Sequence, residues 1–182
     1  SPPVTGQTRW TEDILHSFAG GVDDGSQPAA GLTADASGAL YGATSRGGPS
    51  DLGTVYKLSP PPSGKAPWTK TTLHSFAGSN DDGAQPAGAL TADRNGALYG
   101  TTARGGPSNQ GTVFKLTPPA GGQGKWTKTI LHSFAGSDGA QPLTGVRADA
   151  GGALYGTTSL GGSSNQGTVF KLTPPAGGQT QW

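Results

Sequence analysis

The sequence contains no cysteine and no methionine, and Glu12 is its one glutamate among 182 residues. Without cysteine there can be no disulfide, no thiolate metal site and no cysteine nucleophile. No apolar run approaches the ~20 residues that a membrane-spanning helix requires. Charged residues make up 13% of the chain and the formal net charge is +1. The composition therefore gives no electrostatic reason to expect a nucleic acid or an anionic membrane as partner.

Glycine and proline are abundant instead, with 33 and 15 residues, and they recur at fixed places between apolar residues. The recurrence is a tandem repeat. The tripeptide His-Ser-Phe begins at His16, His74 and His132, and both 74 − 16 and 132 − 74 equal 58. The third copy is shorter, because residues 80–83 of the second copy correspond to 138–139 of the third. We interpret residues 1–182 as a single repeat domain, with copies at about 10–67, 68–125 and 126–182.

Each repeat contains four short segments that are predicted to be β-strands. In the first copy they cover residues 31–35, 39–44, 54–58 and 68–76. They alternate in polarity, are rich in Val, Thr, Tyr and Trp, and are separated by turns that contain Gly, Pro or Asn-Gly. The pattern predicts an all-β fold of three tandem four-stranded antiparallel repeats, arranged like propeller blades. A stacked β-solenoid is the alternative, which the hairpin turns and the long period make less favoured.

Five motifs follow one another in the repeats with small variations: Leu-His-Ser-Phe, Asp-Gly-x-Gln-Pro, Ala-Leu-Tyr-Gly-Thr-Thr, Gly-Gly and Gly-Thr-Val-Phe-Lys-Leu. In this order they resemble the GloVer (Gloeo/Verruco) tandem repeat of bacterial surface proteins, and the resemblance covers residues 10–172. The resemblance implies an extracellular or cell-surface protein with a propeller-like β-repeat fold. It implies no catalytic residue.

The order of the strands is permuted relative to a set of complete blades. Residues 10–18 match the fourth strand of a repeat but precede the first set, whereas residues 168–172 match a third strand with no fourth strand after it. Trp182 aligns with Trp126, where the next fourth strand would begin. Closing a ring within one chain would give three blades, below the 4–8 that are usual in propellers.

We therefore expect the N-terminal strand of one chain to complete the last blade of another, in a ring or in a head-to-tail filament. The alternative is that the chain is a piece of a longer array. The predicted function is that of a non-enzymatic extracellular scaffold, whose partner is a second copy of itself and which needs no cofactor and no metal. The residues expected at this interface are Trp10, Ile14, Leu15, Phe18, Val169, Phe170, Leu172 and Trp182.

Histidine and aspartate also repeat with the strands. The three histidines could form a metal site, but equivalent positions of different blades lie far apart, so a structural role beside a nearby loop is favoured. The acidic loops at 23–25, 81–83 and 138–139 could bind calcium. They offer one or two carboxylates where a hard cation needs six or more oxygens, and turn formation by Asp and Gly explains the same residues.

Repeated aromatic residues give the alternative function, which is that of a carbohydrate-binding propeller. Indole and phenol rings at equivalent positions could form shelves on which sugar rings stack. Burial in the blade cores explains the same residues and is the favoured interpretation. The residues concerned are Trp68, Trp126, Tyr41, Tyr99 and Tyr155. Glycans are therefore the second partner class, and neither nucleic acid nor membrane insertion is expected.

Overall fold

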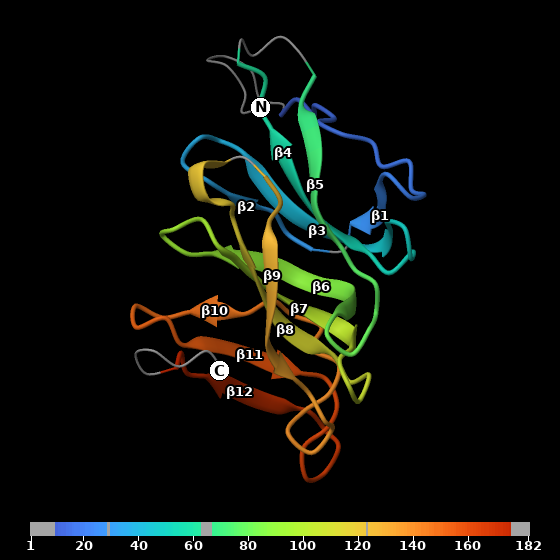
Figure 1. Ribbon diagram of the computed structural model, residues 1–182, viewed down its shortest axis with the longest axis vertical. Coiled ribbons are helices and arrows are strands. Elements are labelled where there is room, and N and C mark those ends of the chain that lie inside the picture. The colour runs from blue at the N-terminus through green and yellow to red at the C-terminus, as the bar shows by residue number, and fades with distance from the viewer. Residues whose placement is uncertain (1–9, 29, 63–66, 123, 176–182) are drawn as a thin grey trace.

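The computed structural model describes residues 10–28, 30–62, 67–122 and 124–175, which form three antiparallel β-sheets along the long axis of the molecule (Figure 1). The first sheet contains β1 (Gly25–Pro28), β2 (Thr33–Ala34), β3 (Leu40–Gly47), β4 (Thr54–Ser59) and β5 (Thr69–Ser75). The second contains β6 (Gly83–Ala92), β7 (Leu98–Gly105), β8 (Thr112–Thr117) and β9 (Thr127–Ser133). The third contains β10 (Arg147–Ala148), β11 (Leu154–Thr158) and β12 (Thr168–Leu172), and a short 3-10 helix, η1 (Ala120–Gly122), follows β8.

The strands follow one another across each sheet in chain order. The second sheet has the order β6-β7-β8-β9, and in the first sheet β1 and β2 both pair with β3 and together take the place of β6. The all-β antiparallel fold is thereby confirmed. In the described part of the chain the three sheets do not close into a ring, so the predicted propeller arrangement is not observed there. No described helix has the length and apolar character that crossing a membrane requires.

The first strand of the repeat begins earlier than the sequence predicts. The Asp-Gly-x-Gln-Pro motif, which the sequence does not predict as a strand, forms β1 in the first sheet and the start of β6 in the second. Glycine allows this pairing, because a Cβ added to Gly25 would lie 2.4 Å from Thr44 Oγ1 of the neighbouring β3. Gln27 then bends the strand with a positive φ of 56°. Glycine and proline interrupt the alternation of polar and apolar residues, so this alternation does not indicate the strand.

Residues 10–18, which are predicted as a strand of the fourth type, form no strand in this structure. The matching residues of the later copies become β5 and β9 by pairing with β4 and β8. A strand requires a neighbour that accepts and donates its backbone hydrogen bonds. Residues 10–18 therefore add no strand to the described sheets of their own chain, and their pairing with another chain stays a prediction.

The hydrophobic core lies between successive sheets. The phenylalanine that follows each fourth-strand motif packs edge-on against an aromatic ring of the next sheet, so each sheet completes its core with a residue from the segment before it. These pairs are Phe18–Tyr56, Phe76–Phe114 and Phe134–Phe170, with ring centroids 5.0, 5.3 and 5.2 Å apart. The N-terminal segment thus takes the same place on the first sheet that the end of β5 takes on the second.

Candidate functional site

A histidine, an aspartate and a lysine meet where the first sheet adjoins the second. Asp82 directly precedes β6, and its carboxylate lies 3.3 Å from His74 Nε2 of β5 and 2.7 Å from Lys128 Nζ of β9. The backbone amides of Ala77 and Gly83 donate hydrogen bonds of 2.8 Å to the same carboxylate. One carboxylate therefore links two fourth strands and the start of a sheet. We call this arrangement the His–Asp–Lys junction.

A second His–Asp–Lys junction lies at the start of the first sheet. The carboxylate of Asp24 is 3.3 Å from His16 Nε2 and 2.6 Å from Lys70 Nζ, and it accepts a hydrogen bond of 2.9 Å from the Ala19 amide. The segment before the first sheet thus makes the contacts that the end of β5 makes with the second sheet. It makes them although residues 10–18 pair with no strand.

The third junction has the histidine and the aspartate without the lysine. Asp138 lies 2.8 Å from His132 Nε2 and accepts a hydrogen bond of 2.9 Å from the Ala135 amide. Among the described residues no lysine forms an ion pair with Asp138. The described residues include no fourth strand of the third sheet that could supply one, and the side chain of Asp138 is 41% exposed against 10% for Asp82.

These contacts lower the pKa values of the three carboxyl groups. Burial alone would raise the pKa of Asp24, but hydrogen bonds from Lys70 and from backbone amides lower it to about 2. Burial likewise acts to raise the pKa of Asp82, but hydrogen bonds from His74 and Lys128 outweigh it and lower the pKa. The pKa of Asp138 is also lowered, because a backbone amide and a histidine outweigh its partial burial. Each aspartate is therefore a negative charge at neutral pH.

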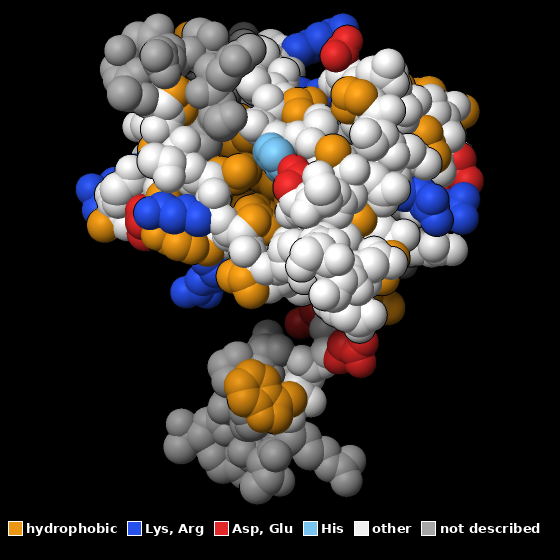
Figure 2. All heavy atoms as spheres, turned by 90° about the horizontal axis from the view of Figure 1, so that it is seen from below, with side chains coloured by type: hydrophobic (Ala, Val, Ile, Leu, Met, Phe, Trp, Pro, Cys, Tyr) orange, Lys and Arg blue, Asp and Glu red, His pale blue; other side chains and the backbone are white. Residues whose placement is uncertain are grey.

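The third sheet ends in an open edge. β4 and β8 pair with β5 and β9, whereas β12 pairs only with β11 among the described strands. Val169 of β12 is 83% exposed, while its equivalents Val55 and Val113 are 0% exposed. Tyr155 on β11 is also partly exposed. Figure 2 looks at the molecule from this side and shows hydrophobic side chains gathered on its surface. We call β12 with Tyr155 and Val169 the open end of the stack.

The structure places the predicted interface residues beside two different sheets. Val169, Phe170 and Leu172 lie on β12 of the third sheet, whereas Leu15 and Phe18 are partly buried in the segment before the first sheet. Of the remaining three, Trp10 and Ile14 are 75% and 78% exposed, and Trp182 lies outside the described residues. Both sets thus contain large apolar side chains that are open to solvent.

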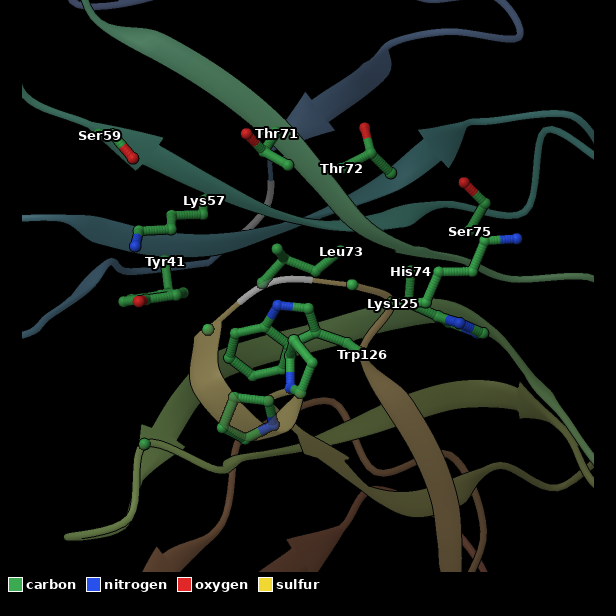
Figure 3. A pocket seen from close by; sticks show the side chains of 15 residues that line it. Tyr41, Lys57, Ser59, Thr71, Thr72, Leu73, His74, Ser75, Lys125 and Trp126 are labelled. Atoms are coloured by element: carbon green, nitrogen blue, oxygen red, sulfur yellow. The ribbon is translucent and has the colours of Figure 1, made fainter.

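A cleft of about 760 Å³ opens between the first and second sheets. Tyr41 of β3 and Trp126, which directly precedes β9, lie side by side in it with ring centroids 6.3 Å apart (Figure 3). Lys57 Nζ is 5.6 Å from the centroid of the Tyr41 ring, and Leu73 and His74 of β5 also line the cleft. Of the residues predicted to stack on sugars, the structure brings Tyr41 and Trp126 together.

The other predicted stacking residues do not share a surface with these two. Tyr99 is buried, and Tyr155 is partly exposed at the open end of the stack. Trp68 is partly buried and has no ring contact among the described residues. Burial in the core, which the sequence analysis favours for the aromatic residues, is therefore observed for Tyr41 and Tyr99.

The buried phenols are structural donors. The hydroxyl group of Tyr41 donates a hydrogen bond of 2.9 Å to Asp35, and that of Tyr99 donates one of 3.1 Å to Asp93. Burial and the neighbouring carboxylate raise the pKa of each phenol to about 12, so both stay protonated at neutral pH. Across the described residues no three His, Asp or Glu side chains converge in the way that would hold a metal ion.

Sequence reasoning identifies the histidine and the aspartate of each junction but misses the lysine. Lys70 and Lys128 occupy the same place in two copies, two residues after a tryptophan, and Glu12 stands at that place before the first copy. A comparison of charges position by position would have singled out this reversal. Lys128 and Asp82 are 46 positions apart in the chain, so local spacing alone does not indicate their contact.

The chain matches the family model of the Gloeobacter/Verrucomicrobia repeat over residues 3–182. It therefore belongs to this repeat family, and the match covers nearly the whole chain. Neither a curated protein nor a solved structure matches it.

Proposed function

We propose that this protein is a non-enzymatic extracellular scaffold that assembles by strand completion between copies. In the proposed contact, residues 10–18 of one copy pair with β12 of another, and the first sheet of the donor copy stacks on the open end of the acceptor. The position of the N-terminal segment on the first sheet supports this most directly. His16 and Phe18 contact the first sheet as the end of β5 contacts the second, while Trp10 and Ile14 are left exposed.

The register of the proposed contact follows from the second sheet. There β8 and β9 pair Val113 with His132 and Phe114 with Ile130. The same register places Val169 opposite His16 of the donor and Phe170 opposite Ile14. Full burial of a valine or isoleucine side chain contributes about 1.5–3 kcal/mol, and the backbone of β12 gains partners as well.

The contact joins two different surfaces, so each copy that binds offers a new acceptor edge. Such a contact closes into a ring when the rotation per copy divides a full turn, which would give the propeller-like arrangement, and otherwise continues as a filament. An unpaired edge with exposed apolar side chains favours association of this kind. The extracellular location rests on the resemblance to repeats of bacterial surface proteins.

Sedimentation velocity and light scattering over a range of protein concentrations test the proposal. We expect the wild-type mass to rise with concentration and Val169→Lys to remain monomeric, because the lysine would place a charge in the new interface. Val22→Lys is the matched control, since Val22 is an exposed valine in the loop before β1. Circular dichroism verifies that each variant is folded. A wild-type protein that is folded and monomeric at every concentration contradicts the proposal.

Saccharide binding in the cleft is the second candidate function, and the observation that favours it is the partly buried ring of Trp126, which lines the cleft beside the buried Tyr41. Aromatic faces beside hydroxyl and ammonium donors suit the apolar and polar faces of a sugar ring. Titration with a panel of oligosaccharides, followed by tryptophan fluorescence, should then give a saturable change in the wild type and in Trp68→Leu but not in Trp126→Leu. An unchanged signal with every oligosaccharide contradicts this candidate.

A further inference from the structure

Beside the open end of the stack, the Asp138 carboxylate lacks the lysine partner that Asp24 and Asp82 have among the described residues. We infer that β12 binds a donor strand with lysine two residues after its tryptophan more tightly than it binds residues 10–18 of another copy, in which Glu12 occupies that place. The preferred partner is therefore a repeat strand of the type that contains Lys70 or Lys128. The inference rests on the strand completion proposed above and names the kind of strand that fits.

The position of the donor charge follows from the observed register. In the second sheet Lys128 pairs with Leu116 of β8, and its Nζ reaches Asp82 at 2.7 Å. The donor residue at the equivalent place would lie opposite Leu172 and point to Asp138. A lysine there would complete the third His–Asp–Lys junction, whereas Glu12 would bring a second carboxylate to Asp138.

Burial makes this position sensitive to charge. The side chains of Lys70 and Lys128 are only 9% and 12% exposed in their junctions, so the donor residue at this place would be largely withdrawn from solvent. Like charges repel more strongly in such a place than in open water. His132 also contacts Asp138. A histidine is present in the other junctions as well, where it accompanies the lysine and does not replace it.

A second charge of the N-terminal segment acts in the opposite direction. The register of the first sheet pairs Lys57 with Thr71, so it places Asp13 of the donor opposite Lys171 of β12. Thr71 and Lys171 are both exposed, and an exposed cross-strand ion pair contributes little. The unfavourable contact at Asp138 therefore outweighs the favourable one at Lys171.

Two segments of the chain provide almost matched donor peptides. The segment 126–134 reads Trp-Thr-Lys-Thr-Ile-Leu-His-Ser-Phe, and the segment 10–18 reads Trp-Thr-Glu-Asp-Ile-Leu-His-Ser-Phe. Both peptides, with Glu12→Lys and Asp13→Thr versions of the second, would be labelled with a fluorophore. Each would be titrated with the full-length protein, and binding would be followed by fluorescence anisotropy at low and high salt.

We expect the peptide 126–134 and the Glu12→Lys peptide to bind at least about tenfold more tightly than the peptide 10–18. Asp138→Asn in the full-length protein should reduce this preference to about twofold, and Asp13→Thr should change affinity by less than about fivefold. Equal affinity of all peptides, unaffected by Asp138→Asn, overturns the charge selection and leaves strand completion in place. Failure of every peptide to bind, including 126–134, overturns strand completion itself.

Discussion

Replacing Asp82 by asparagine should destabilise the protein by about 3 kcal/mol. Asparagine keeps one acceptor oxygen but has no charge, so Lys128, whose side chain is 12% exposed, loses its counter-ion. A hydrogen bond to a charged group contributes about 1.5–3 kcal/mol, and an unpaired buried charge costs about 3–5 kcal/mol. Lys128 still donates to the Asp81 carbonyl oxygen at 2.7 Å, which places the loss at the lower end of that range.

The same replacement at Asp138 should cost only about 1 kcal/mol, because Asp138 is more exposed and has His132 but no lysine among the described residues. Urea unfolding at pH 7, followed by circular dichroism, measures both losses in the free energy of unfolding. Asp81→Asn is the control, since Asp81 is an exposed neighbour whose carboxylate makes no ion pair with Lys128. Equal losses for Asp82→Asn and Asp138→Asn would refute the reasoning that the lysine accounts for most of the difference.

Three further predictions concern the backbone and the titratable groups. Gly88→Ala should cost about 2–3 kcal/mol more than Gly96→Ala in urea unfolding. Both glycines have a positive φ, but a Cβ at Gly88 would lie 1.9 Å from the Gly145 backbone nitrogen, whereas one at Gly96 would have Pro118 Cγ at 3.9 Å as its nearest neighbour. The pKa of Asp24 falls from 3.8 to about 2 on folding, so its stabilisation of about 2 kcal/mol is present above pH 4 and is lost as the pH falls towards 2; Asp24→Asn should flatten the acid limb of the stability curve. The pKa of Tyr99 rises from 10 to about 12 on folding, so its stabilisation is complete below pH 10 and is lost as the pH rises towards 12; ultraviolet difference titration against Tyr99→Phe should show this late ionisation.

The second, third and fourth strands of the repeat could be predicted because their signal is local. β4 and β8, for example, contain the sequences Thr-Val-Tyr-Lys-Leu and Thr-Val-Phe-Lys-Leu. These segments are rich in β-branched and aromatic residues, and a glycine precedes and a proline follows each of them. The first strand could not be predicted in this way. Its start at Gly83 depends on close approach to Thr102 of β7, where a Cβ would lie 2.4 Å from the threonine side chain. That contact is non-local and leaves no alternating pattern in the sequence.

The candidate site was predictable to a similar extent. One histidine and one acidic loop in every copy indicate structural residues, and the structure pairs them at His16–Asp24, His74–Asp82 and His132–Asp138. The lysine is missed because its aspartate lies before the first strand of its own sheet, 46 positions away in the chain. The two side chains meet only in the folded protein, and no local pattern in the sequence indicates this contact.

Exposure in this protein depends on place in the stack more than on residue type. Leu32 of the first copy is 50% exposed, whereas Leu90 at the same place in the second copy is 4% exposed, because only the second is covered by a preceding sheet. In stacked repeats each unit is stabilised by its neighbours, so the terminal surfaces keep contacts that only another unit can complete. Glu12 lies on such a terminal segment and is exposed, so its charge has little effect on the fold of an isolated chain. In the contact proposed above, residues 10–18 would pair with β12 of another copy, and the Glu12 carboxylate would lie beside that of Asp138.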